Sequence, residues 1–438
     1  MNIPESEMLD SKAGASADEV VRTPDTPKKE LSPREALEKL RKGEPLQNVR
    51  IERLIFRGEF PEAVELRNVT LVFPRFEKVT FKRSVSFAGC TLISPKFSPK
   101  TVFEMGLNLH EATLIKAGFN GVTVKGSLRC DNLETHGLLK IIHTRFEGMV
   151  RLWEARFNGW VHFTDCEFLG QADFRSFHAE EGMNLNRCHF KDEVLLRGAT
   201  VCKKLDLSGS RFEGMLDLSK AKLHDFVYVE SIEQGEKQRF AFYNTVTERM
   251  LIRPDQLEGR VDSEERGDYL QAMHEYGFLK RVFHELHRFH EEDWAYYRFK
   301  VNHRRCCQRS WRRPWTKLFQ AADWLILDQG CGYGTNPFRA IRAALIIILM
   351  FALIYMAGID HFNIAKEQLP FPVEEPDSLA NRIVFGLTTS AAVFTAGFEC
   401  ANGMGKGWMN LPLMIESMLG LFLWGLFIVA FSRKVIRE

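Results

Sequence analysis

The feature that most constrains this sequence is an apolar residue that recurs at alternating steps of five and six positions. The pieces FEGMVRLWEAR, FNGWVHFTDCE and FLGQADFRSFH illustrate the repeat, because each joins a six-residue step to a five-residue step. The large apolar positions of this ladder include Phe146, Leu152, Phe157, Phe163, Phe168, Phe174, Leu185, Phe190, Leu196, Val201, Leu207, Phe212, Leu218 and Leu223. A small or β-branched residue often stands two positions earlier, as Ala155, Val161 and Cys166 do. Helices and simple strands lack this period, whereas a solenoid with stacked turns accounts for it.

The ladder resembles the pentapeptide-repeat family, in which the central position is Leu or Phe and the residue two before it is small. The resemblance covers roughly residues 49–229 and implies a right-handed β-helix with four faces per turn. The extra residue in most alternate repeats departs from the family and implies a bulged or distorted square coil. At about 22 residues per turn, the stretch from Leu54 to Val229 predicts about eight turns.

The residues before the ladder are polar at first and then helical. Residues 1–31 carry three prolines and are predicted to be disordered, because they cannot bury enough apolar surface to offset the entropy of ordering. Ser32, Pro33 and Glu35 form the pattern of a capping box, so a short helix is expected within residues 32–48. This helix is expected to cap the solenoid.

Charge and cysteine usage restrict the partners and the compartment. The chain has 59 Lys and Arg against 57 Asp and Glu, a formal net charge of +2. A nucleic-acid-binding domain is clearly basic, so no nucleic-acid partner is expected, and the strongly acidic DNA-mimic proteins with similar repeats are excluded as well. Nine cysteines without a CxxC pair, and an N-terminus without the pattern of a signal peptide, favour a reducing cytosol for most of the chain.

The sequence offers little for catalysis. His284, His287 and His290 recur at every third position, which is compatible with a metal or pH-sensing site. A polar helix face is the preferred interpretation, because HELHRFH lacks the HExxH arrangement. No nucleophile, base and orienting residue can be assembled, so the protein is not expected to be an enzyme and no metal or cofactor is expected.

Residues 230–330 are predicted to connect the ladder to the C-terminal quarter. Residues 230–262 are polar and include Pro254, and from Glu264 apolar residues at steps of three and four predict a helix. A second helical stretch, EDWAYYRFKVNHRR, follows. The sequence RSWRRPWTKLFQAADWLILD interleaves Trp and Arg, which predicts an interfacial helix on the cytosolic leaflet, with a soluble amphipathic helix as the alternative.

Two stretches near the C-terminus are apolar enough to cross a bilayer, which takes about twenty residues. The first is expected at about residues 338–358 and the second, with Glu416 as its one charge, at about residues 411–432. Lys and Arg crowd before the first and after the second, while the loop between them is acidic, so both termini are expected in the cytosol. The chain is therefore predicted to be a multi-pass protein of the cell membrane, in contact with lipid.

A third apolar segment, at about residues 378–394, lies between these spans and is too short to cross. It predicts a re-entrant helix whose C-terminal dipole would place partial negative charge toward a pore axis. Small residues after it permit an extended backbone whose carbonyl groups line an ion path. These residues are Thr395, Ala396, Gly397, Phe398 and Glu399.

Residues 331–438 resemble the two-span pore domain of the potassium-channel superfamily. The resemblance is carried by Thr388 and Thr389 in the pore helix, the Thr-x-Gly-aromatic sequence Thr395-Ala396-Gly397-Phe398, and Glu416 four residues before Gly420. It implies a tetrameric pore with a filter at residues 395–399. It also implies that Glu416 supports the filter from behind and that Gly420 is a hinge.

The filter departs from the superfamily. Glu399 and Cys400 stand where a second Gly and an Asp are usual, and Phe394 stands where a Thr is usual. We therefore expect weak or altered selectivity among potassium and sodium ions, with a ring of Glu399 that concentrates cations, divalent ones included. The expected function is an oligomeric cation channel, gated through a cytosolic β-helix that docks a protein or ligand. The alternative is a membrane-anchored scaffold or interaction protein without conduction.

Overall fold

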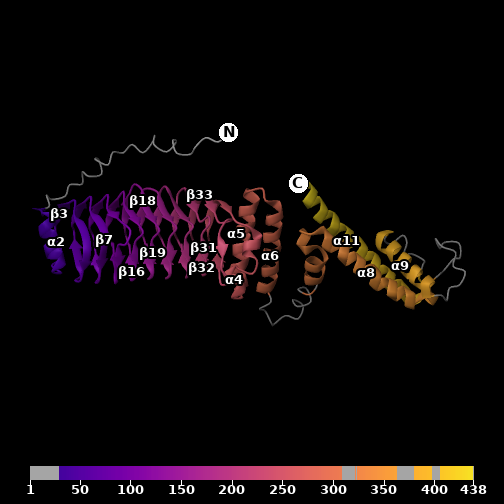
Figure 1. Ribbon diagram of the computed structural model, residues 1–438. Coiled ribbons are helices and arrows are strands. Elements are labelled where there is room, and N and C mark those ends of the chain that lie inside the picture. The colour runs from indigo at the N-terminus through magenta and orange to yellow at the C-terminus, as the bar shows by residue number, and fades with distance from the viewer. Residues whose placement is uncertain (1–28, 308–320, 322, 363–378, 397–404, 438) are drawn as a thin grey trace, which may run out of the picture. The chain divides into compact units, whose positions relative to one another are not determined.

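The computed structural model describes residues 29–307, 321, 323–362, 379–396 and 405–437 (Figure 1). The chain divides into two compact units. The first consists of Met1–Gly214 with Ser231–Glu233, and the second of Met215–Glu230 with Gln234–Glu438.

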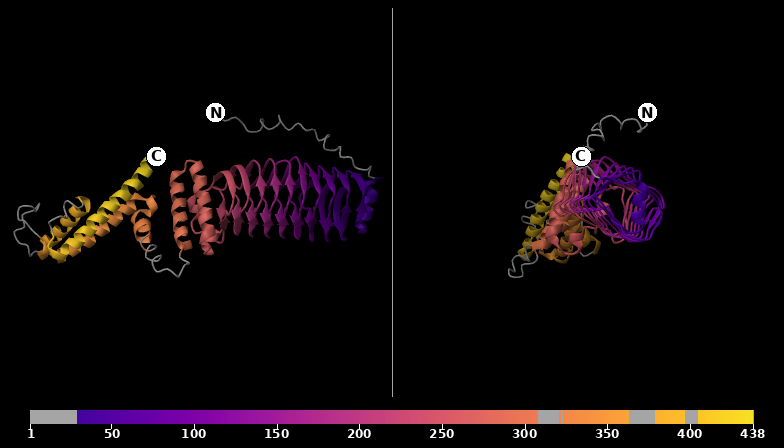
Figure 2. Two further views of the ribbon diagram at one scale, coloured as in Figure 1. Left: turned by 180° about the vertical axis from the view of Figure 1, so that it is seen from behind. Right: turned by 90° about the vertical axis from the view of Figure 1, so that its left-hand side faces the viewer.

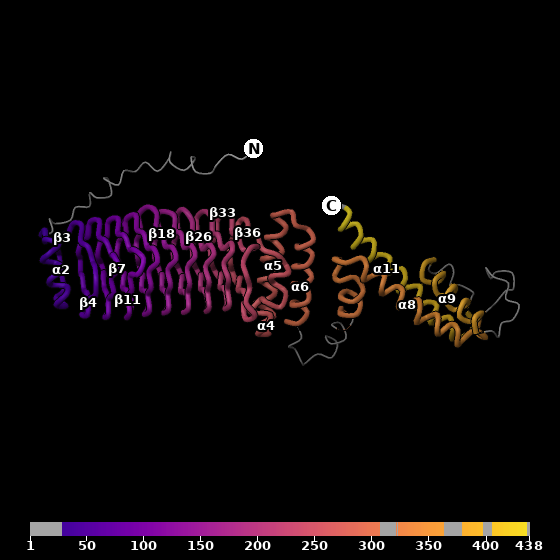
Figure 3. Tube along the Cα trace, in the orientation of Figure 1, coloured from indigo at the N-terminus to yellow at the C-terminus, as the bar shows by residue number. Residues whose placement is uncertain are grey.

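The first unit is a parallel β-solenoid, whose turns follow one another along a common axis (Figures 2 and 3). Strands on successive turns pair in a constant register: Val150 lies opposite Ala172, and Ala172 opposite Val194. One strand per turn joins a single sheet, and its members in this unit are β2 (Leu46–Gln47), β5 (Val64–Arg67), β8 (Val85–Ser86), β12 (Gly106–Asn108), β16 (Ser127–Arg129), β20 (Val150–Arg151), β24 (Ala172–Asp173) and β28 (Val194–Leu195). We call its outer surface the β20 face.

The remaining strands of this unit belong to a second, larger sheet. They are β1 (Lys29–Glu30), β3 (Val49–Glu52), β4 (Ile55–Phe60), β6 (Thr70–Val72), β7 (Arg75–Phe81), β9 (Thr91–Ile93), β10 (Lys96–Phe97), β11 (Val102–Phe103), β13 (Thr113–Ile115), β14 (Gly118–Asn120), β15 (Thr123–Val124), β17 (Glu134–His136), β18 (Leu139–Ile142), β19 (Arg145–Phe146), β21 (Arg156–Phe157), β22 (Val161–Thr164), β23 (Glu167–Phe168), β25 (His178–Ala179), β26 (Gly182–Asn186), β27 (His189–Phe190), β29 (Thr200–Val201), β30 (Lys204–Asp206) and β31 (Arg211–Phe212). Most are two to four residues long, as expected of a coil that turns every five or six residues.

Aromatic rings fill the interior of the solenoid. Phe146, Phe168, Phe190 and Phe212 stack on successive turns, with ring centroids 4.9, 4.5 and 4.9 Å apart. All four are buried, and so are the small residues of the ladder, such as Ala155. The inward-facing positions predicted from the five- and six-residue steps are therefore confirmed.

The two step lengths correspond to two kinds of corner. A five-residue step closes with a β-turn in which the Ala155 amide donates to the Leu152 carbonyl at 3.1 Å and Glu154 has a φ of 55°. A six-residue step is a wider corner where glycines stack: a Cβ on Gly148 would lie 2.6 Å from the Gly126 carbonyl oxygen. At these glycines the adjacent backbones approach too closely for a side chain.

A short helix covers the N-terminal end, as predicted. It is α2 (Pro33–Arg41), and the Ser32 hydroxyl accepts a hydrogen bond from the Glu35 amide at 3.3 Å. Ala36 and Leu40 are fully buried, and Gly43 follows the helix with a φ of 75°. The capping residues therefore begin the helix where the sequence pattern indicates.

The solenoid pattern continues in the second unit beyond Val229. There β32 (Met215–Asp217) pairs with β35 (Arg239–Ala241), and β33 (Lys222–Tyr228) pairs with β36 (Val246–Leu251). The chain forms about ten turns in all, whereas the ladder between Leu54 and Val229 predicts about eight. The first part of the segment that the sequence predicts to be a polar connector therefore belongs to the solenoid. Its inward-facing residues Phe240, Phe242 and Met250 are fully buried, although charged residues lie between them in the sequence. The short strand β34 (Glu233–Gln234) also falls here.

Helices follow the last strands. They are α3 (Pro254–Leu257), α4 (Asp262–Glu265), α5 (Tyr269–Glu285) and α6 (Phe289–Cys307). The two long helices lie side by side, and Tyr276 of α5 packs edge-on against Trp294 of α6 with ring centroids 5.6 Å apart. The helical structure predicted after Glu264 is confirmed, and the apolar residues Leu279, Val282 and Phe283 are buried in α5, whereas Leu270 at its start is exposed.

Among the described residues, three further helices are long and apolar enough to cross a membrane: α8 (Pro337–Ala357), α9 (Leu379–Ala396) and the segment Gly407–Val435, which contains most of α11 (Asn410–Arg437). Short elements flank them, namely η1 (Asp323–Gln329), η2 (Gly332–Gly334), η3 (Ile359–His361) and η4 (Gly407–Met409). Many of the large apolar side chains on these helices are exposed, for example Leu353, Leu379 and Leu421. Such surfaces suggest association with a membrane.

Candidate functional site

A buried carboxylate joins the three apolar helices. Glu416 of α11 is fully buried and accepts hydrogen bonds from the Tyr355 hydroxyl of α8, at 2.5 Å, and from the Ser390 hydroxyl of α9. Ser390 itself lies 2.9 Å from the Ile348 carbonyl of α8. A carboxyl group in an apolar layer requires such partners, so these residues fix the three helices against one another.

Two glycines let the same helices approach closely. A Cβ on Gly420 of α11 would lie 2.3 Å from the carbonyl oxygen of Phe394 in α9. A Cβ on Gly386 of α9 would lie 2.6 Å from the carbonyl oxygen of Ala352 in α8. By contrast, a Cβ on Gly425 would meet no atom within 4 Å. Gly420, which the resemblance implies is a hinge, thus lies at a close contact between α11 and the end of α9.

The predicted filter begins inside a helix. Helix α9 extends to Ala396, two residues beyond its expected end at Phe394, and both Thr395 and Ala396 belong to its last turn. The Thr395 hydroxyl donates to the Ala391 carbonyl at 2.7 Å, which is compatible with helical backbone at this position. The predicted filter residues Gly397, Phe398 and Glu399 lie outside the described residues.

The residue of α9 that contacts Glu416 is Ser390, which follows the predicted pore-helix residues Thr388 and Thr389. Thr388 turns its hydroxyl back to the Val384 carbonyl at 2.8 Å, and Thr389 is buried, but it is Ser390 that reaches the carboxylate. Ser390 follows Gly386 by one helical turn and precedes Phe394 by another. This four-residue spacing places Ser390 on the packed face of α9. The spacing is the signal in the sequence from which the role of Ser390 could have been predicted.

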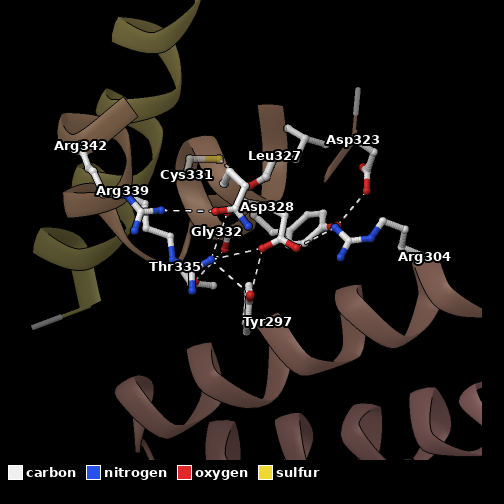
Figure 4. Close-up of polar contacts among 12 residues, drawn as sticks. Tyr297, Arg304, Asp323, Leu327, Asp328, Cys331, Gly332, Thr335, Arg339 and Arg342 are labelled. Atoms are coloured by element: carbon white, nitrogen blue, oxygen red, sulfur yellow. Dashed lines mark hydrogen bonds and ion pairs between the residues drawn. The ribbon is translucent and has the colours of Figure 1, made fainter. Parts of the chain in front are cut away.

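A second polar cluster lies before the first apolar helix (Figure 4). Asp328 of η1, whose side chain is 4% exposed, pairs with Arg304 of α6 at 2.7 Å and with Arg339 of α8 at 3.2 Å. It also accepts a hydrogen bond from the Tyr297 hydroxyl of α6 at 2.9 Å. One buried carboxylate therefore connects the helix pair α5 and α6 to the start of α8.

Tyrosine and a second acid complete this cluster. The Tyr333 hydroxyl donates to Asp323 at 2.8 Å and accepts from Arg304 at 2.9 Å. Burial raises the pKa of Tyr333, and the hydrogen bond to Asp323 raises it further. Burial lowers the pKa of Arg304, but the Asp328 hydrogen bond and nearby negative groups outweigh it and leave that pKa raised. Arg304 therefore stays charged and Tyr333 stays neutral at physiological pH.

A third contact involves the end of α11. Arg433 pairs with Asp293 of α6 at 2.5 Å, and its guanidinium lies 4.8 Å from the ring centroid of Tyr296, also in α6. Helix α6 thus pairs directly with the end of α11 and is linked to the start of α8 through the shared carboxylate of Asp328 in η1. None of these acidic partners was predicted, although an Arg at the edge of an apolar run is a local signal that a partner exists.

The His-rich stretch gives no metal centre among the described residues, where no group of three or more His, Cys, Asp or Glu could hold an ion. His284 contacts Glu292 of α6 at 3.0 Å instead.

No family model matches this chain, and no curated protein matches its sequence.

Proposed function

We propose that this chain is one subunit of a tetrameric cation channel. Helices α8 and α11 span the membrane, α9 is a re-entrant pore helix, and the segment after α9 is the ion filter. The solenoid and both termini lie in the cytosol, where the solenoid controls the pore through α5 and α6.

The observation that carries this proposal is the pair of ion contacts on α6. Arg339 at the start of α8 shares Asp328 with Arg304 of α6, and Arg433 at the end of α11 pairs with Asp293 of the same helix. Charged pairs of this kind belong outside the hydrocarbon layer, so both ends lie on one side. This arrangement supports an even number of crossings, although three of the described helices are long enough to cross. In the proposed topology the chain crosses twice and α9 returns to the side it entered.

The buried cluster around Glu416 supports the same proposal. A re-entrant helix exposes its end within the membrane region and needs fixed contacts to hold it. Glu416, Ser390 and Tyr355 supply hydrogen bonds from three helices, and Gly420 brings the Phe394 backbone against α11. In the proposed pore, these contacts hold the end of α9 toward the central axis, where its dipole favours cations.

The test is an ion-flux assay on the purified chain in liposomes, with potassium, sodium and calcium gradients. We expect cation flux with weak discrimination between potassium and sodium, and a tetrameric mass in detergent. Glu399→Gln should lower calcium flux and cation flux at low salt. Glu374→Gln, which changes an acid that precedes α9 in the sequence and is not part of the predicted filter, is the matched control. Strong potassium selectivity in the native protein would contradict the altered filter.

A membrane-anchored scaffold is the competing function. The size of the solenoid favours it, because about ten turns offer an extended surface for partners. A monomer or dimer in detergent without cation flux in any gradient would support the scaffold and overturn the channel.

A further inference from the structure

The β20 face carries a row of arginines around an exposed tryptophan. Arg129 of β16 and Arg151 of β20 both pair with Asp131, and Arg175, two residues after β24, pairs with Asp173 through two hydrogen bonds of 2.8 Å. Trp153 lies between the Asp131 and Arg175 turns, because its carbonyl accepts from the Asn132 amide and the next amide, that of Glu154, donates to the Arg175 carbonyl. Trp153 lies in the turn after β20 and is 45% exposed, a large fraction for so large an apolar residue.

The carboxylates of this face are covered, whereas the guanidinium groups are not. The side chains of Asp131 and Asp173 are 3% exposed, but those of Arg129 and Arg175 are 54% and 49% exposed. A guanidinium has five N–H donors and a bidentate carboxylate uses two of them. The surface therefore presents unused donors and positive charge beside an aromatic ring, which suits an acidic peptide with apolar residues.

The chain contains such a peptide at its own N-terminus. Residues 1–19 hold five carboxylates, namely Glu5, Glu7, Asp10, Asp18 and Glu19, against one lysine, Lys12. Met8 and Leu9 stand between two of these acids and offer apolar atoms for Trp153. We infer that residues 1–19 bind the β20 face of the same chain, with their carboxylates on Arg129 and Arg175 and an apolar side chain on Trp153.

The distance to be bridged is short. The described chain begins at Lys29, which pairs with Val49 in the first turns of the solenoid. Strand β16 lies four turns from β2 in its sheet, a distance of about 19 Å at the usual strand spacing of about 4.8 Å. Residues 20–28 reach about 30 Å when extended, so they can carry the acidic segment to the β20 face.

The experiment uses the chain without residues 1–19 and a fluorescent peptide of that sequence. We expect the peptide to bind this truncated protein. Its affinity should fall by about tenfold or more between 50 and 300 mM salt, because salt screens the several exposed ion pairs that the complex would form. The double variant Arg129→Gln with Trp153→Ala should weaken binding about tenfold or more, because it leaves the Arg151–Asp131 and Arg175–Asp173 pairs in place. Arg187→Gln is the matched control, since Arg187 makes a similar bidentate pair with Asp165 away from the β20 face.

Comparing the full chain with the truncated chain distinguishes binding of the chain's own N-terminal segment from binding of an outside partner. A tethered copy has an effective concentration of order millimolar, so the added peptide should bind the full chain at least about tenfold more weakly than the truncated one. Equal binding to both chains would overturn the inference and point to an acidic partner protein. Absence of peptide binding, or an equal loss in Arg187→Gln, would overturn it as well. Neither outcome depends on whether the protein conducts ions.

Discussion

The solenoid and the apolar helices are stabilised in opposite ways. In the solenoid, each turn repeats the contacts of the last: stacked Phe rings inside, backbone hydrogen bonds between turns, and paired charges outside. Around the apolar helices, single buried carboxylates, Glu416 and Asp328, each connect three elements. The solenoid therefore spreads its stability over many equivalent contacts, whereas the helical region joins its elements through a few individual polar side chains.

The largest effect is expected from opening the aromatic stack. Phe168→Ala removes a ring that lies 4.9 Å from Phe146 and 4.5 Å from Phe190, and should lower the free energy of unfolding by about 3–5 kcal/mol. Urea unfolding followed by far-UV circular dichroism measures it. Phe73→Ala is the control, because Phe73 is 52% exposed and should change stability by less than about 0.5 kcal/mol. Equal losses would contradict the assignment of inward positions.

Next in size is the loss of the buried ion pair. Asp328→Asn leaves Arg304 and Arg339 facing each other without a negative partner, which should cost about 3 kcal/mol. The thermal melt in detergent should fall, and trypsin should cut faster between α6 and α8. Asp323→Asn, which keeps an acceptor for the Tyr333 hydroxyl but removes the negative charge, should have a smaller effect. If the two variants behave alike, Asp328 is not the residue that connects α6 to α8.

Close packing of α9 against α11 gives a third contrast. Gly420→Ala adds a Cβ within 2.3 Å of the Phe394 carbonyl oxygen and should destabilise the three-helix packing by about 1–3 kcal/mol. Gly425→Ala on the same helix meets open space and should be neutral or slightly stabilising. Thermal melts and cation flux should both fall for the first variant alone. A larger loss in Gly425→Ala would place the contact elsewhere on α11.

The smallest effect concerns pH. Burial raises the pKa of Glu275 in α5, and Asp262 raises it further, against hydrogen bonds from Ser263, Gln271 and the Phe242 amide. A raised pKa in the folded state means that the stability contributed by this group is present below its unfolded value of 4.5 and is lost as pH rises through the folded value.

Glu275→Gln should therefore raise the melting temperature by about 2–4 °C at pH 8 and leave it nearly unchanged near pH 4. Differential scanning fluorimetry across this range measures the difference. Glu285→Gln, an exposed acid on the same helix, serves as the control and should show no such trend. A melting temperature that falls at pH 8 would show that the ionised carboxylate stabilises α5.

The sequence predicts the solenoid well because its signal is local. Each turn repeats Phe or Leu at fixed steps, so a register such as Val150 with Ala172 follows from counting along the chain. The strands β35 and β36 escaped prediction because the apolar residues there, Phe240 and Met250 among them, are spaced irregularly within charged sequence.

The candidate site was predicted in part. Glu416 is conspicuous as a charge in an apolar run, and Gly420 as a glycine in a helix, so both could be named without a structure. The partners of Glu416 could not be named in this way, because they are distant in the sequence: Tyr355 lies 61 residues before Glu416, and Ser390 lies 26 residues before it. The pairing of Asp328 with Arg304 likewise depends on how separate helices pack, which no local periodicity encodes.

The constant register between turns also makes the solenoid adjustable in length. A whole turn, for example residues 148–169, could be removed so that Gly170 meets Gly126 and Ala172 meets Leu128 as their predecessors do. Each such deletion would shorten the solenoid by about 4.8 Å while keeping every remaining corner and stacked ring in phase. The reach of this region can therefore change in evolution, or in the laboratory, in units of one turn.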